Sequence, residues 1–199
     1  EIQEALKNNE FTFFAQPQCN IATHQIVGAE ALVRWVKPDG TMVSPGAFIP
    51  VLEKMQRQGL PMRSLMDVGS GGGLPAVVIA VCFPELKVLS VDAVAKKTTF
   101  ITQAALELGL KNLRAKHSRV ENIKEKFDVV TCRAFSSLKD FVSLTESNIG
   151  EPGMWLAMKG RRPDAELQEL PSFAEVTEVI DLHIPGLGEE RSVVLMRHI

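Results

Sequence analysis

The stretch Leu65-Met66-Asp67-Val68-Gly69-Ser70-Gly71-Gly72-Gly73-Leu74-Pro75 decides the fold of this 199-residue chain. It begins as an apolar strand, continues as a glycine-rich turn and ends at a proline that suits the first turn of a helix. A second predicted strand follows and ends at Asp92. In open α/β sheets this unit binds an adenosine-containing ligand, because glycines let it approach the backbone and the carboxylate holds the ribose hydroxyls.

The glycine spacing separates two cofactor classes. A dinucleotide fingerprint has the form Gly-x-Gly-x-x-Gly, whereas this chain has Gly69, Gly71 and Gly73, with Leu74 at the position of the third fingerprint glycine. The form acid-x-Gly-x-Gly-x-Gly, which begins here at Asp67, is associated with S-adenosyl-L-methionine, whose methionine tail brings no pyrophosphate to the helix N-terminus. We therefore predict an S-adenosylmethionine site, and a tight turn without a ligand is the alternative that the motif leaves open.

Composition and charge exclude several classes of protein. A hydrophobic content of 45% and a net charge of -2 fit a globular protein and argue against wholesale coating of nucleic acid, although they leave room for a local basic patch. No apolar run reaches the ~18–20 residues of a membrane span, and the acidic start of the chain does not resemble a signal peptide. The three scattered cysteines have no C-x-x-C spacing, which favours a reducing compartment over disulfides or zinc. The sequence predicts a cytoplasmic protein with no metal and no membrane partner.

From residue 65 onward, predicted strands and helices alternate. Strands are expected at 65–68, 87–91, 113–116, 127–132 and 154–158, and helices at 75–83, 96–108, 138–148 and 164–170. A turn at Glu151-Pro152-Gly153 should precede the fifth strand. Two further strands, at 176–184 and 192–197, have no helix between them and should form an antiparallel hairpin. Five parallel strands with helical crossovers and a final hairpin predict an α/β, Rossmann-like sheet of the class I methyltransferase type.

The first 56 residues follow a different pattern. Two alternating, strand-like segments at 11–17 and 26–35 are joined by a polar turn at 20–25, and a second turn at Pro38-Asp39-Gly40 leads to an amphipathic helix at 48–58. The segment 57–64 is the natural linker. We therefore expect two domains, a strand–strand–helix fragment at 1–56 and a cofactor-binding domain at 57–199.

Several motifs in the second domain occur in a characteristic order. They are Asp67–Pro75, Ser118-Arg119-Val120-Glu121, Arg133-Ala134-Phe135, Ala157-Met158-Lys159-Gly160, and Pro185-Gly186-Leu187 with Glu190-Arg191. In this order residues 57–199 resemble the RsmG (GidB) family, bacterial methyltransferases that modify guanine N7 in 16S ribosomal RNA.

The resemblance implies a set of functional residues. Its cofactor contacts would be Gly69, Gly71, Leu74, Asp92, Val120, Glu121 and Arg133. Arg133 is also the candidate for positioning the acceptor, and no other catalytic residue is predicted because guanine N7 needs no deprotonation. The implied partner is 16S rRNA or the 30S subunit, and Lys159, Arg161 and Arg191 are candidates for contacting RNA phosphates. A solvated basic rim is the alternative for these three.

The first 56 residues carry motifs of another kind. Gln16-Pro17, Gly28, Glu30-Ala31-Leu32, Arg34-Trp35 and Phe48-Ile49-Pro50 resemble the start of an EAL domain, the barrel that hydrolyses cyclic-di-GMP. The resemblance implies that Glu30 occupies a metal-ligand position, but the other ligands belong to later barrel strands and the chain has no Asp-Asp pair. One carboxylate cannot hold a catalytic cation, so Glu30 is interpreted as vestigial and phosphodiesterase activity is predicted absent.

We interpret this combination as an engineered or selected chimera of two unrelated α/β parents, with a natural fusion of degraded genes as the alternative. The EAL fragment would replace an N-terminal helical region that packs beside the cofactor pocket in the RsmG family, so methyl transfer is expected to be impaired. Two rival hypotheses are a purely structural chimera without ligand, and residual cyclic-dinucleotide binding that depends on Arg34. The oligomeric state, including a strand-mediated dimer, is left open, as is whether the N-terminal strands join the main sheet.

Overall fold

The computed structural model describes residues 11–19, 26–36, 42–43, 49–60, 62–182 and 190–199. These residues form two compact units. The first contains the N-terminal strands up to residue 43, and the second contains everything described from residue 49 onward.

The first unit is a small antiparallel sheet. Strand β1 (Phe11–Cys19) pairs with β2 (Ile26–Val36), and β2 pairs with the short β3 (Met42–Val43). The two strands predicted at 11–17 and 26–35 are confirmed, and they form a sheet of their own rather than extending the main one. The predicted turns at 20–25 and 38–40 lie outside the described residues.

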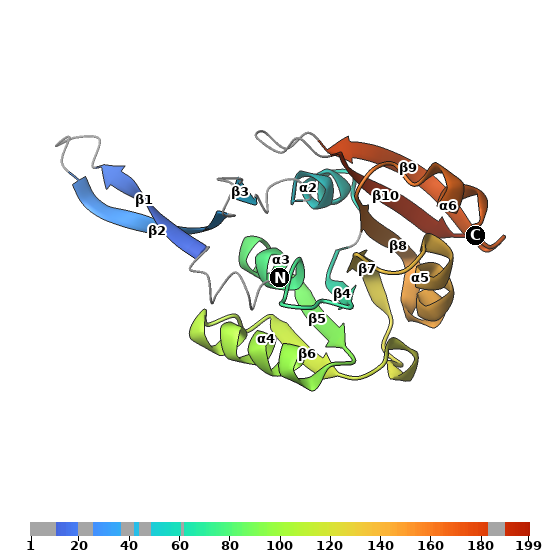
Figure 1. Ribbon diagram of the computed structural model, residues 1–199, viewed down its shortest axis with the longest axis horizontal. Helices are drawn as coiled ribbons and strands as arrows, with labels where there is room; N and C mark the ends of the chain where they lie inside the picture. Colours follow the sequence, from blue (N-terminus) through green and yellow to red (C-terminus); the bar gives the residue numbers. More distant parts are fainter. Residues whose placement is uncertain (1–10, 20–25, 37–41, 44–48, 61, 183–189) are drawn as a thin grey trace. The chain divides into compact units, whose positions relative to one another are not determined.

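The second unit is a seven-stranded sheet with helices on both faces, which confirms the predicted α/β, Rossmann-like fold (Figure 1). Its strand order is β6-β5-β4-β7-β8-β10-β9. The first five strands are parallel, and β10 runs antiparallel between β8 and β9, as the predicted hairpin requires. The elements are α2 (Ile49–Arg57), β4 (Ser64–Val68), α3 (Ala76–Cys82), β5 (Lys87–Asp92), α4 (Ala95–Glu107), β6 (Leu113–His117), the 3₁₀ turn η2 (Val120–Asn122), β7 (Phe127–Arg133), α5 (Leu138–Thr145), the 3₁₀ turn η3 (Glu146–Asn148), β8 (Ile149–Lys159), α6 (Asp164–Gln168), β9 (Ala174–Leu182) and β10 (Arg191–His198).

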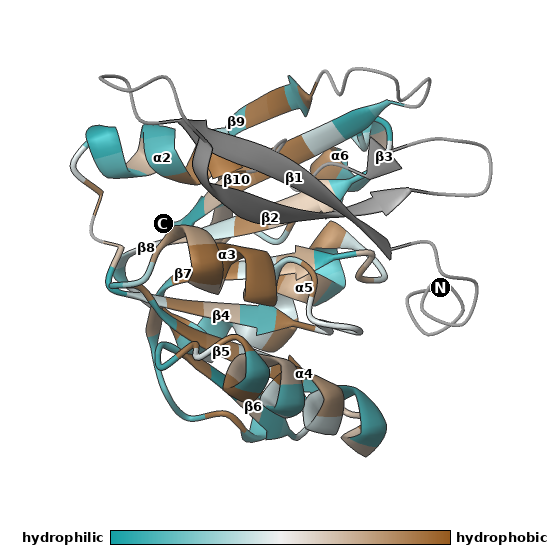
Figure 2. Cartoon of the chain, turned by 90° about the vertical axis from the view of Figure 1, so that its left-hand side faces the viewer, coloured by the Kyte–Doolittle hydropathy of each residue, from teal (hydrophilic) through white to brown (hydrophobic). Residues whose placement is uncertain are grey.

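Two apolar clusters fill the spaces between sheet and helices. Leu65 and alternate residues of the neighbouring strands pack with α2, α3 and α4, whereas Met66 and Trp155 belong to the cluster that includes α5. The central parallel strands are apolar on both sides because both sides are covered. Figure 2 shows the resulting contrast between α3, whose seven residues are all apolar, and the polar outer face of α4.

The start of β8 differs from the prediction. The strand begins at Ile149, so the turn expected at residues 151–153 is wrong: these residues lie inside the strand. Phe127 of β7 pairs with Ile149 and Val129 pairs with Met154, which leaves β8 with three more residues than β7 between the same two pairs. The Pro-Gly signal therefore marks a bulge, in which extra residues bend a strand without ending it.

Gly73 determines how closely α3 can follow the glycine loop. It has a φ of 90°, and a methyl group on its α-carbon would lie 2.7 Å from Cγ2 of Val77 and 3.3 Å from Ile101. Val77 is β-branched and has little freedom to move aside. The close contact between loop, α3 and α4 therefore requires a residue without a side chain.

We expect Gly73→Ala to lower the free energy of unfolding by about 2–4 kcal/mol, the sum of a left-handed backbone on an L-residue and overpacking. Gly109, which ends α4 with a φ of 66° and has no atom within 4 Å of an added methyl group, is the matched control. Gly109→Ala should cost only the backbone part, about 1–2 kcal/mol. Urea unfolding followed by circular dichroism measures both values, and equal losses would contradict the packing argument.

Candidate functional site

The glycine loop is attached to the end of the neighbouring strand. The Gly69 amide donates to the carbonyl of Val91 at 2.8 Å, and Gly69 and Gly71 both have positive φ values, 70° and 59°. A left-handed backbone at two positions turns the chain sharply at the carboxyl end of β4. Open α/β sheets bind their ligands at these strand ends.

Asp92 closes the loop from β5. Its Oδ2 accepts the Gly71 amide at 3.0 Å, and its Oδ1 accepts the Val94 amide at 2.8 Å. The ammonium of Lys97 lies 3.7 Å from Oδ2. The residue is 6% exposed, and each carboxylate oxygen has further lone pairs. The carboxylate can therefore hold the loop and still accept hydrogen bonds from a ligand.

Asp67 is a buried carboxylate beneath the same loop, and its side chain is fully inaccessible. Its Oδ2 accepts the Ala76 amide at 3.3 Å, while Oδ1 has no hydrogen-bond partner. Burial raises the pKa of Asp67 to about 7, although the neighbouring Ser70 hydroxyl, the Ala76 amide and the charge of Arg133 act in the opposite direction. The motif contains this residue, but its burial under α3 was not predicted from the pattern.

The remaining predicted cofactor contacts lie at neighbouring strand ends. Leu74 is half-buried in the loop, whereas Val120 in η2 is 6% exposed and packs in the core, with Glu121 exposed beside it. A hydrogen bond from the Ser118 amide to the Asp92 carbonyl, at 3.1 Å, places η2 next to the end of β5. Arg133 is exposed at the end of β7, on the other side of β4.

The three candidates for RNA contact differ in their surroundings. Lys159 is 12% exposed, and its ammonium lies 2.7 Å from Glu166, which also accepts the Leu138 amide at 2.7 Å. This lysine therefore joins β8, α6 and the start of α5, a role that its sequence position did not indicate. Arg161 is exposed just after β8, and Arg191 begins β10 beside it, with Nη1 donating to the carbonyl of Glu190 at 2.8 Å.

The loop fits the predicted S-adenosylmethionine. A methyl group on Gly71 would meet only the Gly69 carbonyl, at 3.9 Å, whereas one on Gly69 would be in van der Waals contact with the Phe135 ring, at 3.7 Å, so this ring borders the space in front of the loop. The Asp92 carboxylate borders this cradle through its hydrogen bond with the Gly71 amide. A backbone cradle with a carboxylate acceptor at its edge suits a ligand with hydroxyl donors.

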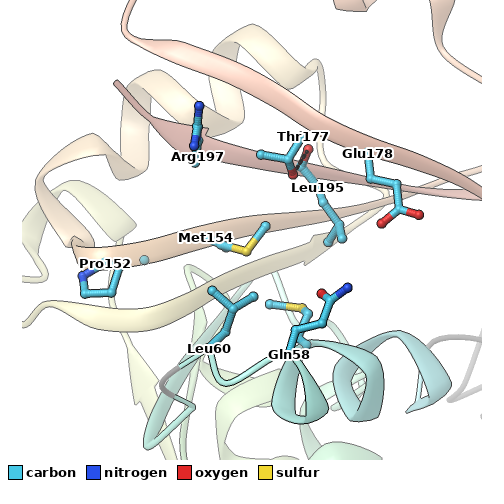
Figure 3. Close-up of a pocket in the computed structure, with 10 residues that line it drawn as sticks. Gln58, Leu60, Pro152, Met154, Thr177, Glu178, Leu195 and Arg197 are labelled. Atoms are coloured by element: carbon cyan, nitrogen blue, oxygen red, sulfur yellow. Dashed lines mark hydrogen bonds between the residues drawn. The ribbon is translucent and has the colours of Figure 1, made fainter.

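A hollow lies at the end of the strands opposite to the glycine loop (Figure 3). It has a volume of about 340 Å³, and its lining includes Leu60 and Met154 with Leu195 of β10. Two ion pairs flank it, Lys54–Glu178 at 2.7 Å and Arg197–Glu175 at 2.6 Å. Because the charged groups at its rim are already paired, we place the candidate site at the glycine loop instead.

Two further features concern metals and membranes. Within the described ranges, no group of three or more His, Cys, Asp or Glu residues is arranged to hold a metal ion. Glu30 lies in β2 opposite Gln16, and its side-chain surroundings are outside what the structure describes. None of the described helices has the length and apolar character needed to cross a bilayer.

Comparison with known proteins identifies the second unit. The family model "rRNA small subunit methyltransferase G", GidB, matches residues 48–195, which is about three quarters of the chain. The chain belongs to the GidB family. A second model, the EAL domain, matches residues 1–60.

Individual relatives agree with this assignment. The ribosomal RNA small subunit methyltransferase G of Paracidovorax citrulli is 58% identical over 133 residues, which cover 67% of this chain and 55% of that protein. The corresponding protein of Polaromonas naphthalenivorans is 48% identical over 153 residues, covering 76% of this chain and 69% of that protein. The chain thus spans little more than half of the first GidB relative.

Solved structures show the same fold at low sequence identity. An S-adenosylmethionine-dependent methyltransferase from Clostridium acetobutylicum matches with a TM-score of 0.65 and 13% identity, covering 78% of this chain and 92% of that chain. The second unit is therefore a methyltransferase scaffold of the GidB family.

The buried Asp67 predicts a pH dependence of stability. The unfolded carboxyl loses its proton near its ordinary pKa of 3.8, whereas the folded one keeps it to about 7. Stability from this group is therefore complete below pH 4 and is lost as pH rises to 7. Between pH 5 and pH 8 the loss should reach about 3 kcal/mol, at 1.36 kcal/mol per unit.

Asp67→Asn should remove this dependence, so that the variant gains stability relative to the native chain as pH rises from 5 to 8. Urea unfolding followed at 222 nm reports on the second unit, which contains all the described helices. Asp181→Asn, at an exposed position on β9, is the control and should follow the native chain. If the free energies of unfolding of the native chain and of Asp67→Asn differ by the same amount at pH 5 and at pH 8, Asp67 ionises normally and the prediction is wrong.

Proposed function

We propose that the chain is a cytoplasmic, S-adenosylmethionine-binding methyltransferase scaffold whose parent activity is N7 methylation of a guanine in 16S rRNA, and that its own catalysis is impaired. One observation carries the proposal: within a GidB-family fold, a glycine loop with an open backbone face is hydrogen-bonded to the Asp92 carboxylate at 3.0 Å. This is the arrangement that holds an adenosine-containing ligand at a sheet edge.

The glycine loop and the neighbouring strand ends each contact a different part of the cofactor in this proposal. Gly69 and Gly71 admit the ligand to the backbone, Leu74 borders it, and Asp92 accepts hydrogen bonds from the ribose hydroxyls. Val120 and Glu121 line the adenine side through η2. The chemistry that the cofactor supplies is an electrophilic methyl group. The chain's own contribution is to hold donor and acceptor in line, and orientation of this kind can supply several kcal/mol.

The acceptor side requires no general base. Guanine N7 carries a free lone pair, so Arg133 at the end of β7 acts by positioning the substrate. Arg161 and Arg191 lie at adjacent strand ends on the same edge and supply positive charge for RNA phosphates. Lys159 contributes mainly through Glu166, because a buried ion pair leaves its ammonium little freedom.

The proposed impairment of catalysis rests on the segment that precedes the methyltransferase scaffold. Residues 1–60 match the EAL domain, and the match to GidB begins at residue 48. We interpret the chain as a chimera with its junction near residue 57, in which an EAL fragment stands in place of the N-terminal region of a GidB protein. Cofactor binding requires only the glycine loop and its strand ends, whereas methyl transfer also requires the RNA to be held in line with the cofactor, to which the replaced N-terminal region would contribute.

Isothermal titration with S-adenosylmethionine and S-adenosylhomocysteine tests the cofactor part. We expect binding that Asp92→Ala weakens by at least about 10-fold, because hydrogen bonds to charged groups contribute about 1.5–3 kcal/mol each. Gly69→Ala should weaken it as well, since the new methyl group enters the open face of the loop. The control Asp181→Ala, on the distant edge strand β9, should bind like the native chain. A cooperatively folded native chain that binds neither ligand would leave only a structural role for the fold.

Transfer of a radioactive methyl group to 30S subunits that lack the modification tests the impairment. We expect a rate well below that of a full-length GidB protein, because in the proposed chimera an EAL fragment stands in place of the N-terminal region of such a protein. A rate equal to that of the full-length protein would show that this replacement does not impair methyl transfer.

A further inference from the structure

The segment that follows β7 passes directly in front of the glycine loop. A methyl group on Gly69 would lie 3.7 Å from Cδ2 of Phe135, so the edge of this ring borders the open face of the loop. The ring is half-buried and tilts by 57° against the fully buried Phe141, with 5.8 Å between the ring centroids. Phe135 is therefore anchored on one side and reaches the candidate site on the other.

Ala134 explains how Phe135 comes to this position. Its φ is 55°, and it is the one residue other than glycine with a positive φ in the described parts of the chain. Strand alternation would place Phe135 on the same face as Val129, which packs with α3, but Phe135 packs with the α5 cluster. The left-handed turn at Ala134 switches the ring to the α5 face. Such conformations are unfavourable for L-residues and are concentrated at functional sites.

The far end of the segment is also held. Ser137 caps α5 by accepting the Asp140 amide at 3.0 Å, and Leu138 donates its amide to Glu166 at 2.7 Å. Glu166 in turn pairs with Lys159. The loop that carries Phe135 is thus fixed at β7 on one side and at the start of α5 on the other.

The strand order indicates which ligand the ring would meet. Asp92, the ribose carboxylate of the proposed site, ends β5 on one side of β4, whereas Phe135 follows β7 on the opposite side. The adenosine part belongs on the β5 side, so the β7 side is left for the methyl acceptor. An aromatic ring there offers a planar base a stacking surface, and base–aromatic stacking tolerates any sequence.

We propose that Phe135 is the surface on which the acceptor base stacks, and that Ala134 and Glu166 are positioning residues that hold the ring beside Gly69. This inference rests on the proposed methyltransferase function and adds a specific contact for its RNA substrate. Arg133, exposed at the base of the same segment, supplies a positive charge next to the stacked base.

The test is a binding comparison that does not require turnover. The probes are two uridine nonamers, one with 2-aminopurine and one with an abasic site at the central position, each measured in the presence of S-adenosylhomocysteine. The native chain should prefer the 2-aminopurine oligonucleotide by about 5-fold to about 150-fold, the range for one stacked base. The preference should disappear in Phe135→Leu and persist in Phe135→Tyr, which keeps the ring. Phe100→Leu, at an exposed position on α4, is the control and should keep the native preference.

Two variants of Ala134 test the effect of the left-handed turn while the Phe135 ring stays unchanged. Ala134→Gly accepts a positive φ freely and should keep the preference, whereas the β-branched Ala134→Val should lose it while the helical signal of the second unit persists. A native chain without preference, or a Phe135→Leu chain that keeps it, overturns the proposal.

Calorimetry with S-adenosylhomocysteine on the same samples distinguishes failure of the stacking inference from failure of the proposed function. Cofactor binding without base preference overturns the stacking inference alone, whereas absence of cofactor binding overturns the proposed function.

Discussion

The attachment of the glycine loop to β5 is the interaction on which the rest of the site depends. Two backbone amides reach the neighbouring strand: Gly69 donates to the Val91 carbonyl and Gly71 to the Asp92 carboxylate. Both glycines have positive φ values, so the loop can turn back over the sheet without side-chain clashes. The start of α3, the open face of the loop and the placement of Asp92 all follow from this attachment.

The site combines this well-satisfied loop with a poorly satisfied carboxylate. Asp67 of β4 is fully buried beside the Ala76 amide that begins α3, with one oxygen unpartnered, and its pKa rises to about 7 because charge is costly without water. A buried acidic group under the proposed ligand is the type of local conflict that proteins retain at functional sites.

The two sides of the site are built in different ways. On the β5 side, hydrogen bonds from backbone amides hold Asp92 in place. On the β7 side, a left-handed alanine, an aromatic pair and the Lys159–Glu166 ion pair hold the segment that carries Phe135. The first arrangement suits the polar ribose that we propose for it, and the second suits a planar base.

Much of this fold and half of its site were predictable from local patterns. The strand at residues 65–68, the glycine turn and Asp92 are adjacent or periodic in the sequence, and periodicity determines which faces of these elements are buried. The bulge in β8 was not predictable, because a Pro-Gly pair that usually ends a strand is here accommodated by pairing with β7. The same holds for Asp67, Lys159 and Phe135. Their burial, ion pairing and direction depend on contacts with α3, Glu166 and α5 that are made across a turn, so no strand or helix period links the partners. The sequence by itself determined the order of elements and the type of ligand loop, whereas the tertiary structure decided which side chains face that loop, because packing between elements sets burial and contact.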